Sequence, residues 1–258
     1  MTEGFEWCDS DGLRWLECRL GNARAAFSTR TGGVSEGPYE SLNLGILTED
    51  APDRVKRNRE LLAGALEREP ATVAMGWQVH GADVQVHHEP PAPGAQGFGS
   101  PGDDLARVDA QVTDSPDVTP LVLVADCVPL ALAAPGVVAM AHCGWRGVAA
   151  GIVERTVTAM RAVGEGVIRA AIGPAIGKCC YEVGPEVADV FERNGHEDAL
   201  DGRMLDLSHV VRCELEELGV ADVALAGVCV SCHPELFFSH RRDGSLTGRQ
   251  AGLAWLAR

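Results

Sequence analysis

Residues 121–147, LVLVADCVPLALAAPGVVAMAHCGWRG, contain two short apolar runs, each followed by a pair of reactive side chains. Asp126-Cys127 follows the first run, and His142-Cys143 follows the second. Apolar runs of this length, bounded by Pro and Gly, are typical of strands that are buried on both faces. We therefore expect Cys127 and His142 to lie at or near the ends of adjacent strands.

The length and charge of the chain limit its fold and its partners. It has 258 residues, enough for a substantial buried core, and no run approaches the roughly 18 apolar residues that span a bilayer. A net charge of −15 argues against nucleic acid or an anionic membrane as the main partner. The acidic start, Met1 to Gly4, does not resemble a secretory signal. We expect a cytoplasmic protein whose nine cysteines are thiols or metal ligands.

Local patterns predict most of the helices and strands. Residues 13–28 predict a hairpin that turns at Gly21-Asn22. Asp50 and Pro52 predict the start of a helix that runs to about residue 67. Further helices are predicted over 147–164, from near Pro185, from a Ser208 cap to Gly219, and, after an Arg-rich loop, at the C-terminus.

Two loop-like segments bear on domain organisation and on substrate binding. Residues 29–45, rich in Gly, Ser, Pro and Asn, are either a surface turn or a substrate loop in which Arg30 supplies a planar fork of donors. The Pro/Gly-rich stretch 89–104 separates segments of similar composition, so it predicts a surface excursion within one domain of residues 1–258. The irregular order of elements favours an α/β (α+β) fold, a mixed β-sheet core flanked by helices, over a regular βαβ repeat.

Three candidate metal ligands lie at the ends of apolar runs: His80, Cys127 and His142. They are too far apart in sequence for a zinc knuckle, but three ligands from separate elements are typical of catalytic zinc, whose fourth position stays open. The same residues also fit a metal-free hydrolase, in which a histidine activates Cys127 and Asp126 lies nearby. The residues alone leave both possibilities open.

Several other motifs favour structural interpretations. Cys229-Val-Ser-Cys232-His233 matches a haem-attachment pattern, but without an export signal we expect buried thiols there, since a second zinc site lacks a matching ligand pair. Asp109, like the acidic pair before it, is expected in a solvated loop. The sequence alone assigns no role to three further cysteines, Cys143, Cys179 and Cys180.

A set of motifs, in consistent order from about residue 27 to the C-terminus, resembles the laccase-domain family, also called the multicopper polyphenol oxidoreductase family. The segments are STRTGGVSEGPYESLNLG, QVHGADV, DAQVTD, ADCVPLAL, AHCGWRG, IGPAIGKCCYEVG, LDL and FFSHRRDGSLTGR. The resemblance implies a catalytic zinc bound by His80, Cys127 and His142. The chain departs from the family pattern at Cys143, usually Ala, at His240, commonly Tyr, and at ILTED in residues 46–50.

Family members are described as purine nucleoside phosphorylases, which implies phosphorolysis of adenosine, inosine or guanosine with adenosine deaminase activity. Phosphate would attack the ribose C1′, and a metal-activated water could attack purine C6. Arg30 and Arg146 are our candidate substrate contacts, and we expect a monomer or small homo-oligomer. Two alternatives are a Cys-His hydrolase of amide bonds in cell-wall precursors and a copper-dependent polyphenol oxidase. Eight histidines without a His-x-His pair are a poor supply for a multicopper cluster.

Overall fold

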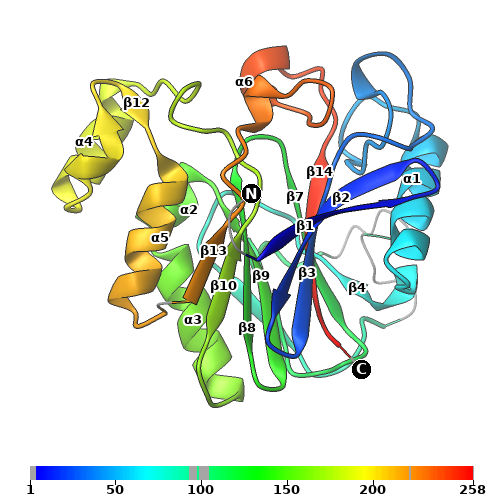
Figure 1. The fold of residues 1–258 in the computed structure, drawn as a ribbon, viewed down its shortest axis with the longest axis horizontal. Helices are drawn as coiled ribbons and strands as arrows, with labels where there is room; N and C mark the ends of the chain where they lie inside the picture. Colours follow the sequence, from blue (N-terminus) through cyan, green and yellow to red (C-terminus); the bar gives the residue numbers. More distant parts are fainter. Residues whose placement is uncertain (1–3, 93–97, 99–104, 221, 258) are drawn as a thin grey trace.

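Two six-stranded sheets pack face to face, with one helix on the outer face of the first and several on that of the second (Figure 1). This arrangement is seen in a computed structural model that describes residues 4–92, 98, 105–220 and 222–257. The predicted mixed α/β fold with helices on its flanks is confirmed, with two sheets in place of the one that we expected. None of the helices in these ranges has the length and apolar composition to cross a bilayer.

The first sheet is antiparallel except for its last strand pair, β7 and β4, which is parallel. Its strand order is β1 (Phe5–Ser10), β2 (Leu13–Leu20), β3 (Ala23–Ser28), β14 (Gln250–Leu256), β7 (Thr119–Val124), β4 (Val73–Ala74). The β2–β3 hairpin turns where the sequence predicted it.

The second sheet contains parallel pairs at both edges and antiparallel pairs in its centre. Its strand order is β13 (Asp222–Leu225), β10 (Arg169–Ile172), β8 (Val128–Ala134), β9 (Val137–Cys143), β6 (Ala110–Thr113), β5 (Val84–His87). A short antiparallel pair, β11 (Leu200–Asp201) and β12 (Met204–Leu205), stands apart from both sheets.

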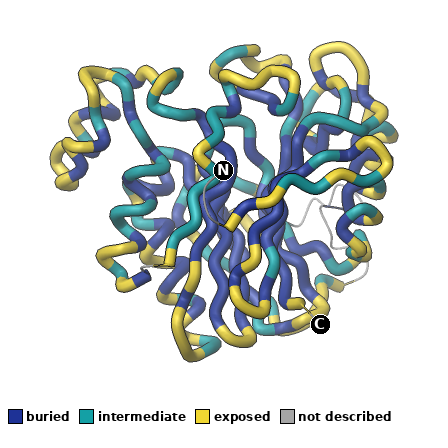
Figure 2. Tube along the Cα trace, viewed as in Figure 1, coloured by how far each residue is buried: buried dark blue, intermediate teal, exposed yellow. Residues whose placement is uncertain are grey.

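Helix α1 (Pro52–Ala65) covers the first sheet, and α2 (Trp145–Ala149), α3 (Ile152–Val163) and α5 (Leu207–Glu217) lie on the second. Helix α4 (Pro185–Arg193) packs against α2, beyond the end of the sheet (Figure 1). The short α6 (His240–Asp243) precedes β14. Figure 2 shows that the central strands are buried along most of their length.

Small residues let the two sheets approach each other closely. The layer between the sheets contains Phe27 of the first sheet and Met140 of the second, among many alanines and valines. A Cβ atom built on Gly173 would lie 2.2 Å from the Phe27 ring, and one on Gly252 would lie 2.4 Å from Met140 Cε. Contacts this short are impossible, so these two glycines set the separation of the sheets.

Several sequence predictions need correction. The C-terminal segment is β14, a fully buried strand between β3 and β7, and not an amphipathic helix, because its residues after Gln250 are apolar on both faces. The cap of α5 is Asp206, whose Oδ1 accepts a hydrogen bond of 2.9 Å from the His209 amide, and not Ser208. The helix predicted over 147–164 is divided at Gly151, where φ is 83°.

The predicted excursion at 89–104 lies largely outside the described residues. Within it, Phe98 is described and is only 1 % exposed, and its ring lies 5.3 Å from the Arg59 guanidinium. At least this residue of the stretch is therefore part of the core that packs beneath α1.

Candidate metal centre and active site

The structure brings His80, Cys127 and His142 together. Cys127 lies where the chain leaves β7 in the first sheet and enters β8 in the second, and His142 lies in β9, paired with Pro129 of β8. His80 lies in the loop between β4 and β5. The candidate ligand atoms of all three side chains lie within 4.8 Å of one another, so that a single cation can contact all three.

The backbone next to two of these side chains adopts an uncommon conformation. Asp126 has φ of 99° and His80 has φ of 59°, both in a region that non-glycine residues rarely occupy. The Asp126 carboxylate accepts hydrogen bonds of 2.6 Å from the Ser239 hydroxyl and from the Arg241 amide. These contacts hold the crossover turn that presents Cys127.

A buried carboxylate, Asp109, joins the two histidines. Its oxygens accept hydrogen bonds from the backbone amides of Val79, His80 and Gly81, at 2.8 to 3.0 Å. Its Oδ1 also lies 2.8 Å from Nδ1 of His142. The prediction that Asp109 lies in a solvated loop is wrong: the residue is 1 % exposed, because the amides and the imidazole replace the water that a carboxylate needs.

Mutual electrostatics favour a thiolate at Cys127. Burial alone raises the pKa of the thiol, but the charge of His142 and hydrogen bonds from His142 and His80 outweigh it and lower the pKa to about 6. Burial lowers the pKa of His142, but Cys127 and Asp109 outweigh this effect and raise it. A thiolate is both the nucleophilic and the metal-binding form of cysteine.

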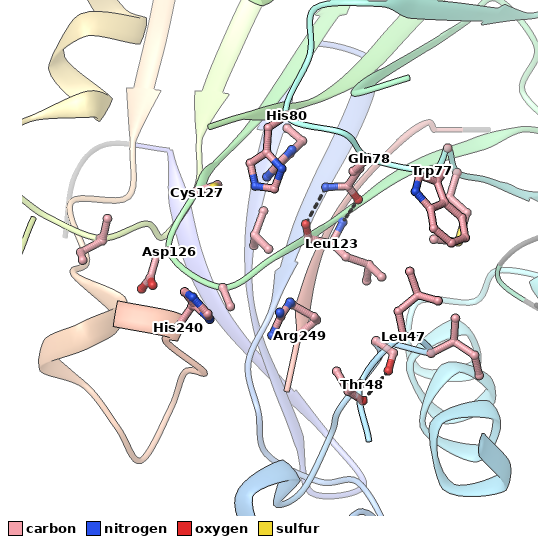
Figure 3. Close-up of a pocket in the computed structure, with 18 of the residues that line it drawn as sticks. Leu47, Thr48, Trp77, Gln78, His80, Leu123, Asp126, Cys127, His240 and Arg249 are labelled. Carbon is pink, nitrogen blue, oxygen red and sulfur yellow. Dashed lines mark hydrogen bonds between the residues drawn. The ribbon is translucent and has the colours of Figure 1, made fainter. Parts of the chain in front are cut away.

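The ligand set lies in the wall of a cavity of about 630 Å³ (Figure 3). His80 and Cys127 lie at one end, and Trp77 and Leu47 lie toward the other. The Gln78 amide forms two hydrogen bonds of 2.8 Å with the backbone of Leu123, so it fixes the loop that carries His80. The cavity therefore combines reactive groups with an apolar surface, as small-molecule sites do.

Basic side chains reach the same cavity from the C-terminal segment. Arg241, Arg249 and His240 contribute to its lining. Burial lowers the pKa of Arg249, and the negative charges of Cys127 and Asp126 oppose this effect. The sequence signal for these residues was the run SHRRDGSLTGR, in which three arginines lie close together.

The two predicted substrate arginines lie outside the cavity lining. Arg30 donates hydrogen bonds to the carbonyls of Glu40 and Pro234, and its guanidinium lies 4.4 Å from the Phe238 ring centroid. It thereby connects the 29–45 loop to the C-terminal segment. The Arg146 guanidinium lies 4.3 Å from the Trp145 ring centroid. Their contact with substrate stays a prediction.

The donor set fits one transition-metal ion. Two imidazoles and a thiolate suit zinc and also suit a single copper. Among the described residues, the other two groups of potential ligands are four cysteines, Cys179, Cys180, Cys229 and Cys232, and a set of Asp198, His209 and Cys213. Neither offers the several histidines that a cluster of coppers requires.

Comparison with solved structures identifies the class of fold. The structure of YlmD from Geobacillus stearothermophilus superimposes with a TM-score of 0.85 at 34 % identity, covering 98 % of this chain and 99 % of that one. A purine nucleoside phosphorylase of Streptomyces coelicolor is 43 % identical over 92 % of this chain and 97 % of its own length. The purine nucleoside phosphorylase YfiH of Escherichia coli is 37 % identical over 90 % and 93 %, respectively.

The family model described as multi-copper polyphenol oxidoreductase laccase matches residues 24–257. The chain belongs to this family, as the motifs in its sequence indicated.

Proposed function

We propose that this chain is a zinc-dependent purine nucleoside phosphorylase that also deaminates adenosine. One observation carries the proposal: two imidazoles and one thiol meet the basic side chains Arg241 and Arg249 in the wall of a single cavity. The names of relatives with 37 and 43 % identity support the phosphorylase part of the proposal. A volume of about 630 Å³ lies within the range of small-molecule sites.

His80, Cys127 and His142 would hold the zinc ion. When bound, zinc supplies Lewis acidity and lowers the pKa of a water molecule. An ionised carboxylate can accept hydrogen bonds but cannot donate them. The contact with Asp109 therefore keeps the proton of neutral His142 on Nδ1, and Nε2 is left available as a metal ligand.

Arg241 and Arg249 would bind phosphate and neutralise its charge. In phosphorolysis, a phosphate oxygen forms a bond to the ribose C1′ while the bond from C1′ to the purine nitrogen breaks, and the base leaves with a proton. The indole of Trp77, at the opposite end of the cavity, is 40 % exposed and offers an aromatic surface for the base. Arg30 and Arg146 stay proposed substrate contacts, although neither lines the cavity.

The test is a product assay with adenosine, inosine or guanosine, each with and without phosphate. Phosphorolysis releases the free base and ribose 1-phosphate only when phosphate is present, and deamination converts adenosine to inosine and ammonia without it. The Cys127→Ser variant should form neither set of products. If the zinc-loaded protein forms no product from any of the three nucleosides, the proposal is wrong.

One observation favours a second function, a metal-free thiol hydrolase. Cys127, His142 and Asp109 form a chain in which a buried carboxylate orients an imidazole beside a thiol whose pKa is lowered. Such an enzyme, acting on amide bonds of cell-wall precursors, would keep its activity after chelation and lose it after alkylation of Cys127. A polyphenol oxidase would instead require copper and consume oxygen.

A further inference from the structure

A second group of thiols lies outside the candidate active site. Cys179 and Cys180 lie in the loop between β10 and α4, and Cys229 and Cys232 lie at the single-turn 3-10 helix η4 (Val230–Cys232). A parallel bridge between Ala175 and Cys229 brings these two segments together. The prediction that Cys229 and Cys232 are buried thiols is wrong, since Cys229 is half-buried and Cys232 is exposed.

The four sulfurs have the spacing of ligands around one ion. All of them lie within 4.8 Å of one another. Cys232 Sγ lies 3.6 Å from Cys179 Sγ and 3.4 Å from Cys180 Sγ. A disulfide requires about 2.05 Å, whereas a tetrahedral zinc with bonds of about 2.3 Å separates its sulfurs by about 3.8 Å. The observed separations are close to the second value.

The surroundings of the thiols resemble those of bound thiolates. The Gly177 amide donates a hydrogen bond of 3.2 Å to Cys229 Sγ. A Cβ atom on Gly177 would lie 3.2 Å from Cys229 Cβ, so the loop can approach the cluster this closely because it carries glycine there. Such outer contacts orient metal ligands and stabilise their negative charge.

A cation also lies beside the cluster. Nη1 of Arg242 donates to the carbonyls of Val230 and Ser231, at 3.1 and 3.3 Å, and therefore fixes the turn between Cys229 and Cys232. The guanidinium is itself held by the Asp243 carboxylate, which accepts hydrogen bonds of 2.7 and 2.6 Å from its Nε and Nη2, so the contribution of Arg242 to the cluster is to hold this turn in place.

We propose that Cys179, Cys180, Cys229 and Cys232 form a structural zinc site, separate from the candidate active site. Soft thiolate ligands select zinc over magnesium or calcium. Four protein ligands complete a tetrahedral shell and leave no position for substrate, in contrast to the three-ligand set at Cys127.

The site has a consequence for the cavity. Ile176 and Tyr181 flank the Cys179-Cys180 loop in sequence, and both line the cavity. The Ile176 amide also donates a hydrogen bond of 2.9 Å to the carbonyl of Asp126, the neighbour of Cys127. A zinc ion in the four-cysteine site therefore fixes one wall of the candidate active site from outside.

The first experiment counts zinc in the purified full chain by elemental analysis. We expect the variant Cys229→Ser/Cys232→Ser to contain one zinc fewer per chain than the unmodified protein. Cys127→Ser should also contain one zinc fewer, because it loses the ion of the candidate active site. The control Cys8→Ser, in β1, should lose none. The proposal is overturned if Cys229→Ser/Cys232→Ser keeps the full zinc content.

A second experiment does not depend on folding of the double variant. Metal-free Cys127→Ser is loaded with Co²⁺, for which four tetrahedral thiolates give intense sulfur-to-cobalt charge-transfer bands. We expect these bands to appear. Added zinc should replace the cobalt, so that the bands disappear, and should protect the four cysteines from alkylation. A spectrum without thiolate bands, or a disulfide among these cysteines detected by mass spectrometry of freshly purified protein, would contradict a zinc site.

Discussion

Nδ1 of His142 lies 2.8 Å from Oδ1 of Asp109, and the two side chains are 4 % and 0 % exposed. The same carboxylate holds the backbone of the His80 loop, so one buried group positions two of the three candidate ligands. Replacing it should therefore disturb metal binding even though Asp109 is not a ligand.

Asp109→Asn should weaken zinc binding by about 10- to 100-fold, because the amide cannot serve all four donors as the carboxylate does. Competition with a chromogenic chelator measures the affinity. Asp114→Asn is the matched control, since Asp114 follows β6 directly and its contact is with the exposed His88. Equal affinities in the two variants would show that Asp109 has no positioning role.

His80→Ala should abolish product formation without unfolding the protein. His80 is exposed at the cavity, so truncating it removes little buried surface. In metal-free protein we expect the free energy of unfolding to fall by less than about 1 kcal/mol, which corresponds to a fall in Tm of less than about 2–4 °C. His88→Ala, also exposed, should change neither activity nor Tm. A large fall in the Tm of metal-free His80→Ala would indicate a structural role for this residue.

Arg249→Gln should raise KM for phosphate by about 10- to 100-fold, the effect of losing a charge-assisted hydrogen bond of about 1.5–3 kcal/mol. Initial rates at varied phosphate and saturating nucleoside measure the change. Arg155→Gln removes an arginine whose exposed partner is Asp83 and should leave KM unchanged. If KM for the nucleoside rises in Arg249→Gln while KM for phosphate does not, Arg249 contacts the nucleoside instead.

Glu214 in α5 should make the protein less stable as pH rises. Burial, with the charges of Glu217 and Glu154, raises the pKa of Glu214 from 4.5 to about 7. The folded state therefore holds a proton that the unfolded chain releases, so this stabilisation is complete below about pH 4.5 and is lost as pH rises through about 7.

Glu214→Gln keeps a neutral side chain at every pH. At pH 8 it should be more stable than the unmodified protein by about 3 kcal/mol, and at pH 4.5 the two should be nearly equal. Urea unfolding at the two pH values measures the difference. Glu216→Gln, on the exposed side of the same helix, should change stability by less than about 0.5 kcal/mol. A gain of the same size at both pH values would contradict the raised pKa.

The parts of the fold that the sequence predicted correctly depend on local signals. The hairpin at 13–28 follows from its turn residues, and α1 follows from Pro52 at its first position. The identity of β14 depends on partners far away in sequence, since it pairs with β3 and β7. A short run of small apolar residues does not reveal such pairing, and the division into two sheets was missed for the same reason.

The candidate site shows the same difference between local signals, which the sequence reveals, and contacts between distant residues, which it does not. Motifs at His80, Cys127 and His142 predicted their convergence, which the structure shows. Asp109 was missed because its burial depends on amides some 30 residues away. The four-cysteine cluster was missed because Cys179 and Cys180 are adjacent in sequence, unlike the C-x-x-C pairs that typically mark zinc, and because they lie about 50 residues from Cys229 and Cys232.

Two separate connections cross from the first sheet to the second at the candidate metal centre: the β4–β5 loop carries His80, and the β7–β8 turn carries Cys127. An ion bound there would cross-link the two sheets at one end of the sandwich. In the metal-free protein, local unfolding would then begin where the two sheets meet, and it would be detected as faster amide exchange and earlier proteolysis. The supply of the ion would therefore control the lifetime of the folded protein as well as its activity.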